Sequence, residues 1–322
     1  MSVLVYTESE NGKFKKASFE LATYAKAIAD KMGVDITALT INNDNPSEIG
    51  EYGISKTLDV KNNQLDKFNA EVYANVIAQA AKKVDAKVVV ISQTANACYI
   101  APMLAVDLEA GYASNAVEVP ELDDSFTVKR TAFTNKAFNH TQITSDIKLV
   151  GLSTNAFGSE KNEVDVSTEE FAPELSDDLF KVNVEEIDKN TDKVSIADAE
   201  IVVSGGRGLK GPDNWNLIED LADTLGAATA CSKPVSDMGW RSHEEHVGQT
   251  GKPVASNLYI AIGISGAIQH LAGISASKNK VVINNDPEAP FFKAADYGVV
   301  GDAFEVVPEL TKKLKEFQAK NN

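Results

Sequence analysis

Short apolar runs rich in β-branched residues alternate with segments of helical periodicity, and this alternation limits the possible folds more than any other feature. The strand-like runs of the first half are Val3–Tyr6, Ile36–Ile41 and Val88–Ile91. Between the first two, apolar residues over Leu21–Met32 recur at helical spacing, and Gly33 supplies a stop. Repeated strand–helix–strand units favour an α/β fold, with an open parallel sheet covered by helices.

The middle of the chain departs from this alternation. Phe126–Arg130, Gln142–Thr144 and Ile147–Val150 are short alternating segments, which is the pattern of antiparallel strands. A polar, acidic stretch then runs from Ser159 to Lys193, and we expect a domain boundary near residues 188–197. Residues 1–190 are thus predicted to form a nucleotide-binding-like N-terminal α/β domain with antiparallel additions.

The alternation restarts after this boundary. Ile201–Val203, Leu258–Ile262 and Val281–Asn284 are predicted strands, Asp213–Leu225 is a predicted amphipathic helix, and a last helix is predicted from Pro308. We therefore expect residues 191–322 to form a doubly wound parallel sheet. Ligands of such sheets bind at the carboxyl ends of the strands, where the strand order reverses.

Composition and charge exclude several classes of protein. The 322 residues are 43% hydrophobic and 24% charged, which suits two folded cores and excludes a wholly disordered chain. The 31 Lys and Arg against 47 Asp and Glu give a formal charge of −16. This argues against extended nucleic-acid binding, because phosphate contacts need clusters of Lys and Arg. No uninterrupted apolar run approaches about 18 residues, so no membrane insertion is expected.

The cysteines and the N-terminus bear on the compartment. Cys98 and Cys231 are far apart and form no CxxC motif, so neither a thiolate metal site nor a disulfide framework is expected. The segment MSVLVYTESENGKFKK has the pattern of neither a secretory signal nor an Arg-rich transit peptide. We expect a bacterial cytoplasmic protein, and a mitochondrial matrix protein only if a transit peptide has been removed.

A glycine-rich turn follows the first predicted strand of the second half. Gly206, Gly208 and Gly211 match GxGxxG between a strand and a helix, where glycines let the backbone approach a pyrophosphate. A tight turn with no ligand gives the same pattern. Arg207 favours a functional role, because arginine can bind a phosphate or lie against a flat ring. Such a turn allows an NAD-dependent oxidoreductase, and the strand–helix–strand pattern of the N-terminal half allows a nucleotide-binding regulatory module.

A second turn of similar character spans Gly263–His270. The small residues Ser265, Gly266 and Ala267 would expose helix amides to an anion, with the Ser265 hydroxyl as a further donor. His270 falls about one turn into the following helix. A lone histidine beside apolar residues is commonly a satisfied core group, but its place beside this turn favours a role in the ligand site.

Two further segments bear polar groups. Val247–Thr250 offers amide and hydroxyl groups on a loop, and the preceding His243-Glu244-Glu245-His246 suggests a metal motif. Its histidines are at i and i+3 rather than at the i and i+4 of HExxH, and no third ligand is evident. We therefore expect a solvated, charged loop and no metal. Asn284–Pro290 and Asp302 follow strand ends and could accept hydrogen bonds from ribose or adenine, although ordinary turns have the same composition.

The same stretches resemble a known family. VGQTGKPVASNLYIAIGISGAIQHLAG and INNDPEAPFFKAADYGVVGDAFEVVPEL resemble the C-terminal FAD-binding domain of the electron transfer flavoprotein α subunit. SGGRGLKGPDNW and CSKPVSDMGW resemble the same family, and IAPMLAVDLEAGYASN resembles its N-terminal domain more loosely. No GxSxG motif supports a serine hydrolase instead.

The resemblance implies a function and partners. It implies a heterodimer with an electron transfer flavoprotein β subunit, one FAD held mainly by this chain, and AMP in the β subunit. It also implies an electron carrier that accepts electrons from flavin dehydrogenases, such as the acyl-CoA dehydrogenases of fatty acid β-oxidation. The electrons then pass to a membrane quinone oxidoreductase.

The resemblance also implies roles for individual residues. Around the flavin ring it places Arg207 at the isoalloxazine, the hydroxyls of Ser232 and Thr250 near N5, and Val247, Gly248 and Gln249 along the ring. Farther along the cofactor it places Ser265, Gly266, Ala267, Ile268 and Gln269 at the pyrophosphate and ribityl chain, His270 at the pyrimidine edge, and Asn284, Asp302 and Ala303 at the adenosine.

Two positions depart from the family pattern. Lys233 stands where the family has an arginine, and Met103 stands where an arginine is more frequent. Lysine keeps the charge but lacks the planar fork that can lie over a ring. Cations at Lys233 and Arg207, with His270 as a further candidate, are expected to favour the anionic reduced forms of the flavin. The cofactor then carries out the redox chemistry, and the protein tunes it.

Overall fold

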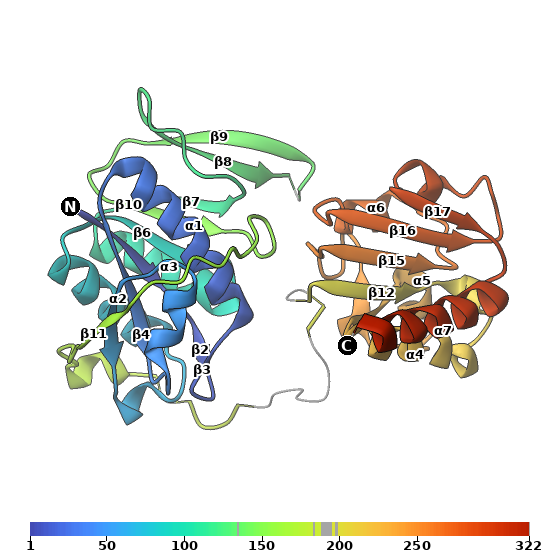
Figure 1. Ribbon diagram of the computed structural model, residues 1–322, viewed down its shortest axis with the longest axis horizontal. Helices are drawn as coiled ribbons and strands as arrows, with labels where there is room; N and C mark the ends of the chain where they lie inside the picture. The colour runs from blue at the N-terminus through green and yellow to red at the C-terminus, as the bar shows by residue number, and fades with distance from the viewer. Residues whose placement is uncertain (134, 183, 188–194, 197–198, 322) are drawn as a thin grey trace. The chain divides into compact units, whose positions relative to one another are not determined.

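The computed structural model describes residues 1–133, 135–182, 184–187, 195–196 and 199–321 (Figure 1). The chain forms two compact units, Met1–Ala132 with Phe138–Asp188, and Phe133–Ala137 with Lys189–Asn322. The boundary that the sequence predicts near residues 188–197 falls largely outside the described residues. Each unit is built around its own sheet, as the alternation of strand and helix patterns predicts.

The first unit contains a sheet of nine described strands in the order β11-β5-β4-β1-β6-β10-β7-β8-β9. The strands are β1 (Ser2–Tyr6), β4 (Asp35–Ile41), β5 (Lys56–Val60), β6 (Ala86–Ser92), β7 (Gly111–Ala116), β8 (Phe126–Ala132), β9 (Ala137–Ile143), β10 (Lys148–Leu152) and β11 (Ser167–Glu170). The helices are α1 (Lys16–Met32), α2 (Ala70–Lys83) and α3 (Ala95–Asp107), and β2 (Ser9–Glu10) pairs with β3 (Lys13–Phe14).

Helices cover both faces of this sheet because its central strands are apolar on both sides. In β1, Val3 and Val5 pack into the core on the α1 side, whereas Leu4 and Tyr6 pack into the core formed with α2 and α3 (Figure 1). Successive side chains of a strand point to opposite faces, so a continuous apolar run fits a strand buried on both sides.

The antiparallel expectation for this unit is right for one strand and wrong for another. β8 pairs with β7 in antiparallel fashion through Ala116 and Arg130. β10, which contains most of the predicted Ile147–Val150 strand, is instead parallel to both β6 and β7. The alternating pattern of Ile147–Val150 is a property of neighbouring residues. Whether a strand is parallel or antiparallel depends instead on the strands, distant in the sequence, with which it pairs.

The second unit contains six described strands, all parallel, in the order β14-β13-β12-β15-β16-β17. They are β12 (Ile201–Gly205), β13 (Ala228–Ser232), β14 (His246–Val247), β15 (Leu258–Ile262), β16 (Asn279–Asn284) and β17 (Tyr297–Val300). In chain order this is 3-2-1-4-5-6, the order of a doubly wound dinucleotide-binding sheet. The predicted fold class is confirmed.

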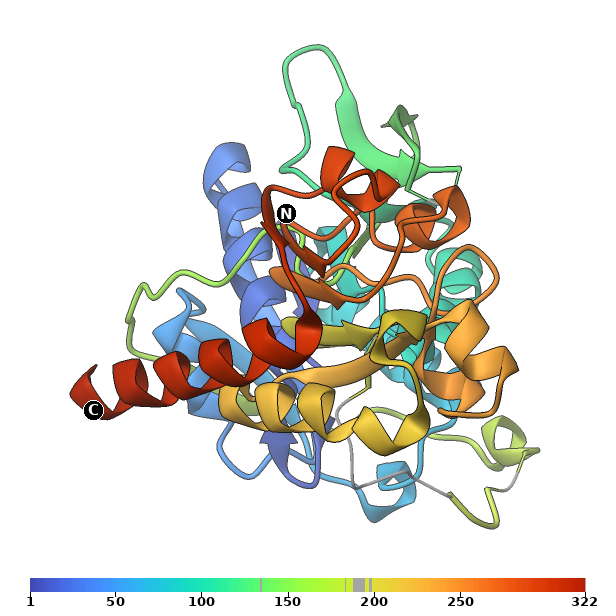
Figure 2. The same cartoon turned by 90° about the vertical axis from the view of Figure 1, so that its right-hand side faces the viewer.

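Four α-helices are described in this unit: α4 (Asn216–Leu225), α5 (Lys233–Asp237), α6 (Ile268–Gly273) and α7 (Ala303–Asn321). α4 and α7 pack side by side on one face through Ile218, Leu221 and Val307 (Figure 2), and the residues around α6 cover the other face. α7 begins at Ala303 rather than at the predicted Pro308. The reason is Asp302, whose Oδ1 accepts a hydrogen bond from the Phe304 amide at 2.9 Å and so caps the helix.

Candidate cofactor site

Two glycine turns meet between β12 and β15, where the strand order of the second unit reverses. The Gly206 amide donates to the Ile262 carbonyl at 2.8 Å, and the Gly208 amide donates to the Gly263 carbonyl at 3.1 Å. A Cβ on Gly206 would lie 2.1 Å from the Gly263 carbonyl oxygen, so only glycine fits there. Nothing lies within 4 Å of a Cβ on Gly211, the third glycine of the motif. The first glycine is therefore required by this backbone contact, and the third is not.

The end of β16 joins the same edge. The Gly263 amide donates to the Ile283 carbonyl at 2.9 Å, and Nδ2 of Asn284 donates to the Ile264 carbonyl at 3.0 Å. Oδ1 of Asn284 accepts from the Asp286 amide at 3.0 Å. The Asn284 side chain, predicted to bind adenosine, thus also braces the turn after β15.

The loop after β14 approaches from another element. The Gln249 amide donates to the Gln269 carbonyl at 2.8 Å, which links this loop to α6. The two glycine turns, the end of β16 and this loop surround a cavity of about 660 Å³. Its volume is within the roughly 300–1,000 Å³ of small-molecule and cofactor sites.

Most of the residues predicted for the site line this cavity. They are Arg207, Ser232, Lys233, Val247, Gly248, Gln249, Thr250, Ser265, Ala267, Gln269, His270 and Asn284. Further lining residues, to which the family resemblance gave no individual role, are Gly208, Pro234, Asp237, His246, Gly263, Ile264, Asp286 and Ala289. The carboxyl-edge rule of parallel sheets explains why segments so far apart in the sequence meet here.

Four predicted residues do not line the cavity. A Cβ on Gly266 would lie 2.4 Å from the Phe291 amide nitrogen, so Gly266 shapes the turn. The Ile268 side chain is 75% exposed, and Ala303 is buried among the apolar residues between the sheet and α7. Asp302 caps α7, and its carboxylate lies 3.9 Å from Nζ of Lys210. The structure thus gives Gly266, Asp302 and Ala303 structural roles.

Lys233 has a carboxylate partner that the sequence analysis missed. Its Nζ lies 3.1 Å from Oδ1 of Asp237, one helical turn along α5, and both side chains are about half exposed. The signal was present in the sequence, because residues four apart on a helix face each other. The cation expected at Lys233 is therefore partly offset by a neighbouring anion.

His270 is a buried, neutral imidazole. Its Nε2 lies 3.0 Å from the hydroxyl of Tyr259. The pKa of His270 is lowered from 6.5 to about 4. Burial is the main cause and the neighbouring His246 adds to it, whereas an interaction with the Val247 backbone acts in the opposite direction. At neutral pH the ring is uncharged, which argues against the cationic His270 that the sequence analysis considered.

The segment before β14 is only partly the solvated loop that the sequence predicts. His243 is exposed, but His246 is buried. Glu245 accepts two hydrogen bonds from Arg241 at 2.8 Å, and Arg241 also reaches Glu219 at 3.1 Å. The solvated-loop prediction is wrong for His246 and Glu245, because the neighbouring strand and this ion-pair network cover them. Among the described residues, no three His, Cys, Asp or Glu side chains are grouped so as to hold a metal ion.

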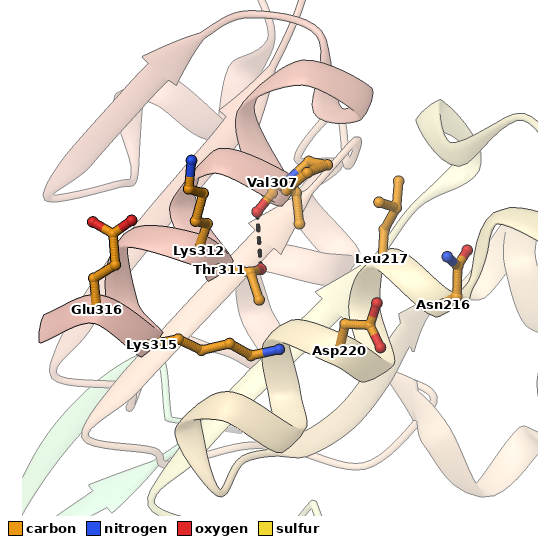
Figure 3. Close-up of a pocket in the computed structure, with 9 residues that line it drawn as sticks. Asn216, Leu217, Asp220, Val307, Thr311, Lys312, Lys315 and Glu316 are labelled. Carbon is orange, nitrogen blue, oxygen red and sulfur yellow. Dashed lines mark hydrogen bonds between the residues drawn. The ribbon is translucent and has the colours of Figure 1, made fainter. Parts of the chain in front are cut away.

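A second cavity, of about 510 Å³, lies between α4 and α7 (Figure 3). Its lining includes Leu217, Asp220 and Lys315, and the Thr311 hydroxyl beside it is used in a 2.9 Å bond to the Val307 carbonyl. It runs along two helices rather than at strand ends, and no glycine turn borders it. We therefore assign the cofactor to the first cavity. Within the described part of the chain, no helix has the length and apolar character needed to cross a bilayer.

Comparisons with known proteins agree with this assignment. Residues 195–275 match the family model of the electron transfer flavoprotein FAD-binding domain, and residues 3–175 match that of the electron transfer flavoprotein domain. The first match identifies FAD as the cofactor of the second unit.

Several curated proteins are similar to this chain over nearly their whole length. The electron transfer flavoprotein subunit α of Bacillus subtilis is 35% identical over 318 residues, covering 98% of this chain and 97% of that protein. The subunit α of Pseudomonas aeruginosa is 36% identical over 312 residues, covering 97% and 99%. That of Thermoanaerobacterium thermosaccharolyticum is 34% identical over 325 residues, covering 98% of each chain. The chain therefore belongs to the electron transfer flavoprotein α subunit family, whose members bind FAD and form heterodimers with a β subunit.

Proposed function

We propose that this chain, with its β subunit, carries electrons from flavin dehydrogenases such as acyl-CoA dehydrogenases to a quinone oxidoreductase. FAD occupies the 660 Å³ cavity, AMP occupies the β subunit, and the heterodimer works in the bacterial cytoplasm. The observation that carries the proposal is the meeting of two glycine turns, two hydroxyls and two cations at the reversal of strand order.

The lining residues fit FAD. Gly206 and Gly263 carry no side chains where their turns touch, so the backbone there is open to a pyrophosphate. Ser232 and Thr250 bring hydroxyls, and His270 brings an imidazole whose buried Nδ1 has no hydrogen-bond partner among the described residues. Unpaired buried polar atoms are rare, so a bound group that pairs with Nδ1 is the natural explanation.

Arg207 and Lys233 tune the site electrostatically. FAD supplies the electron-transfer chemistry when bound, and these side chains supply positive charge at the cavity wall. A unit charge at about 4 Å is worth roughly 4 kcal/mol at an effective dielectric of about 20. Lys233 delivers less than this, because Asp237 lies beside it and both groups are exposed to solvent.

Co-expression with the β subunit tests the proposal. The purified heterodimer should be yellow and should release one FAD and one AMP on denaturation. Its FAD should be bleached by an acyl-CoA dehydrogenase with its substrate and restored by a quinone oxidoreductase. A colourless heterodimer that takes up no FAD would contradict the cofactor site, and a yellow one that no flavin dehydrogenase reduces would contradict the proposed donors. Tight binding of NAD without FAD would instead support the dehydrogenase alternative at Gly206–Gly211.

A further inference from the structure

Two buried imidazoles line the cavity from different elements. His246 on β14 is 1% exposed and His270 on α6 is 5% exposed. Gly248 lies between them, since a Cβ there would be 3.4 Å from Nε2 of His246 and 3.8 Å from Cα of His270. The Nδ1 atoms of both rings are buried without hydrogen-bond partners among the described residues. Two such atoms beside one cavity indicate that the bound ligand changes the hydrogen bonding or protonation of these rings.

The two rings differ in their hydrogen bonds. Nε2 of His270 is 3.0 Å from the Tyr259 hydroxyl, and the pKa of His270 is lowered to about 4, mainly by burial, so this ring stays neutral at neutral pH. The His246 ring makes no hydrogen bond within the described part of the chain, so a proton can be added to it without losing one. Of the two imidazoles, we therefore expect His246 to accept a proton more readily.

The surroundings of His246 in this chain disfavour its protonated form. Burial is the main cause that lowers the pKa of His246; His243, with its ring centroid 5.2 Å away, and Lys233 lower it further, and Asp237 opposes them. Asp237 is already paired with Lys233 at 3.1 Å. The imidazole therefore lacks an unshared carboxylate that would hold it protonated.

Two more groups face His246 from neighbouring elements. On β13, its register partner Cys231 is a neutral thiol, because burial raises the pKa of Cys231 to about 12. On η6 (His243–Glu245), the Glu245 carboxylate is held by Arg241. With His270 neutral on α6, the charged groups that act most directly on His246 are Lys233 and Asp237, and Arg207 lines the same cavity. A further negative charge gained by the bound ligand would favour the protonated form of His246.

We propose that His246 is the proton-accepting residue of the FAD site. When the bound FAD gains an electron from its reduced donor, one proton moves from solvent to a ring nitrogen of His246, and the net charge of the cavity is unchanged. The proposal rests on this cavity being the FAD site, as proposed above. By linkage, reduction raises the proton affinity of His246, and protonation of His246 raises the reduction potential by the same factor.

Histidine resonances of the heterodimer test this directly. The chain contains four histidines, so single His→Gln variants assign every histidine signal of a labelled chain paired with unlabelled β subunit. Full reduction with dithionite should raise the pKa of His246 by about one unit or more, tenfold in proton affinity. The exposed His140, on β9 of the first unit, is the control and should shift less than about twofold in proton affinity. An unchanged pKa of His246 would overturn the proposal.

The pH dependence of the potential gives a second readout. Between about pH 5 and 8 the wild-type potential for the first electron should fall with rising pH. His246→Gln should flatten this slope and lower the potential at the acidic end by about tenfold in the equilibrium constant, or 59 mV. His140→Gln should follow the wild type.

A His246→Gln slope equal to that of the wild type would overturn the assignment. If His246→Gln does not retain FAD, the resonance experiment on the wild-type heterodimer still decides the question. A wild-type heterodimer that binds no FAD would contradict the proposed function itself, so the two failures are distinguishable.

Discussion

The hydroxyl of Tyr259 and Nε2 of His270 lie 3.0 Å apart inside the second unit, joining β15 to α6. Both side chains are buried. Burial raises the pKa of Tyr259 and lowers that of His270, so a neutral phenol and a neutral imidazole share this hydrogen bond at neutral pH. Unfolding therefore releases a histidine that takes up a proton more readily than it does in the native state.

Acidification should destabilise the protein through His270. Its folded pKa of about 4 is below the unfolded value of 6.5, so between these values the unfolded state binds more protons. The free energy of unfolding therefore rises with pH in this window, and acidification across it removes up to roughly 3 kcal/mol. Urea titrations of the FAD-stripped protein should show this slope. His270→Gln should reduce it, whereas the exposed His140→Gln should not; an equal slope in His270→Gln would contradict the assignment.

Gly206→Ala should abolish FAD binding or weaken it at least about tenfold, or 1.4 kcal/mol. The added methyl would meet the Gly263 carbonyl oxygen at 2.1 Å, and backbone on both sides leaves nothing flexible to move. Gly211→Ala is the matched control, because its methyl meets nothing within 4 Å. Fluorescence titration of the apo heterodimer with FAD measures both affinities. An equal loss of FAD affinity in the two variants would show that the close approach of the two glycine turns does not determine FAD binding.

Lys233→Ala and Asp237→Asn should shift the flavin potential in opposite directions. Loss of the cation lowers the potential and loss of the anion raises it, because added positive charge favours the reduced, anionic cofactor. For an exposed pair worth about 0.2–1 kcal/mol, each shift should be about 10–40 mV. Spectroelectrochemical titration of the heterodimer measures them. Shifts of the same sign in both variants would rule out this electrostatic explanation.

Glu20→Gln should destabilise the first unit by about 2–4 kcal/mol, since hydrogen bonds to charged groups are worth about 1.5–3 kcal/mol each. The Glu20 carboxylate is 6% exposed and accepts hydrogen bonds at 2.8 Å from the amides of Asn155, Phe157 and Gly158. A glutamine would turn its own NH₂ donors toward one of these amides. Chemical denaturation measures the loss, with the exposed Glu186→Gln as control. A loss below about 0.5 kcal/mol would contradict the carboxylate's role as an anchor for this loop.

Features set by nearby residues were predictable from the sequence. The strands β12 and β15 and the glycine turns after them follow from local apolar runs, small residues and the edge rule of parallel sheets. The sixteen individual site residues come instead from the family resemblance, and twelve of them line one cavity. The individual roles of these residues in binding FAD remain predictions.

Features set by distant contacts were not predictable. The parallel direction of β10 depends on insertion between β6 and β7, and its own residues do not encode that choice. The burial of His246 depends on the pairing of β14 with β13. The polar residues beside His246 in the sequence therefore led to the wrong prediction that it lies on a solvated loop. The structure adds that Asp302 caps α7 and that Ala303 lies in the apolar core, which the sequence patterns did not indicate, while their expected place at the adenosine stays a prediction.

The contact between Gly206 and Gly263 involves main chain alone. No side chain intervenes, so substitution elsewhere cannot easily widen or reshape this junction. The redox properties of the site can therefore change through substitutions of lining residues such as Lys233, Asp237 and His246. Such substitutions leave the backbone contact between the two glycine turns unchanged.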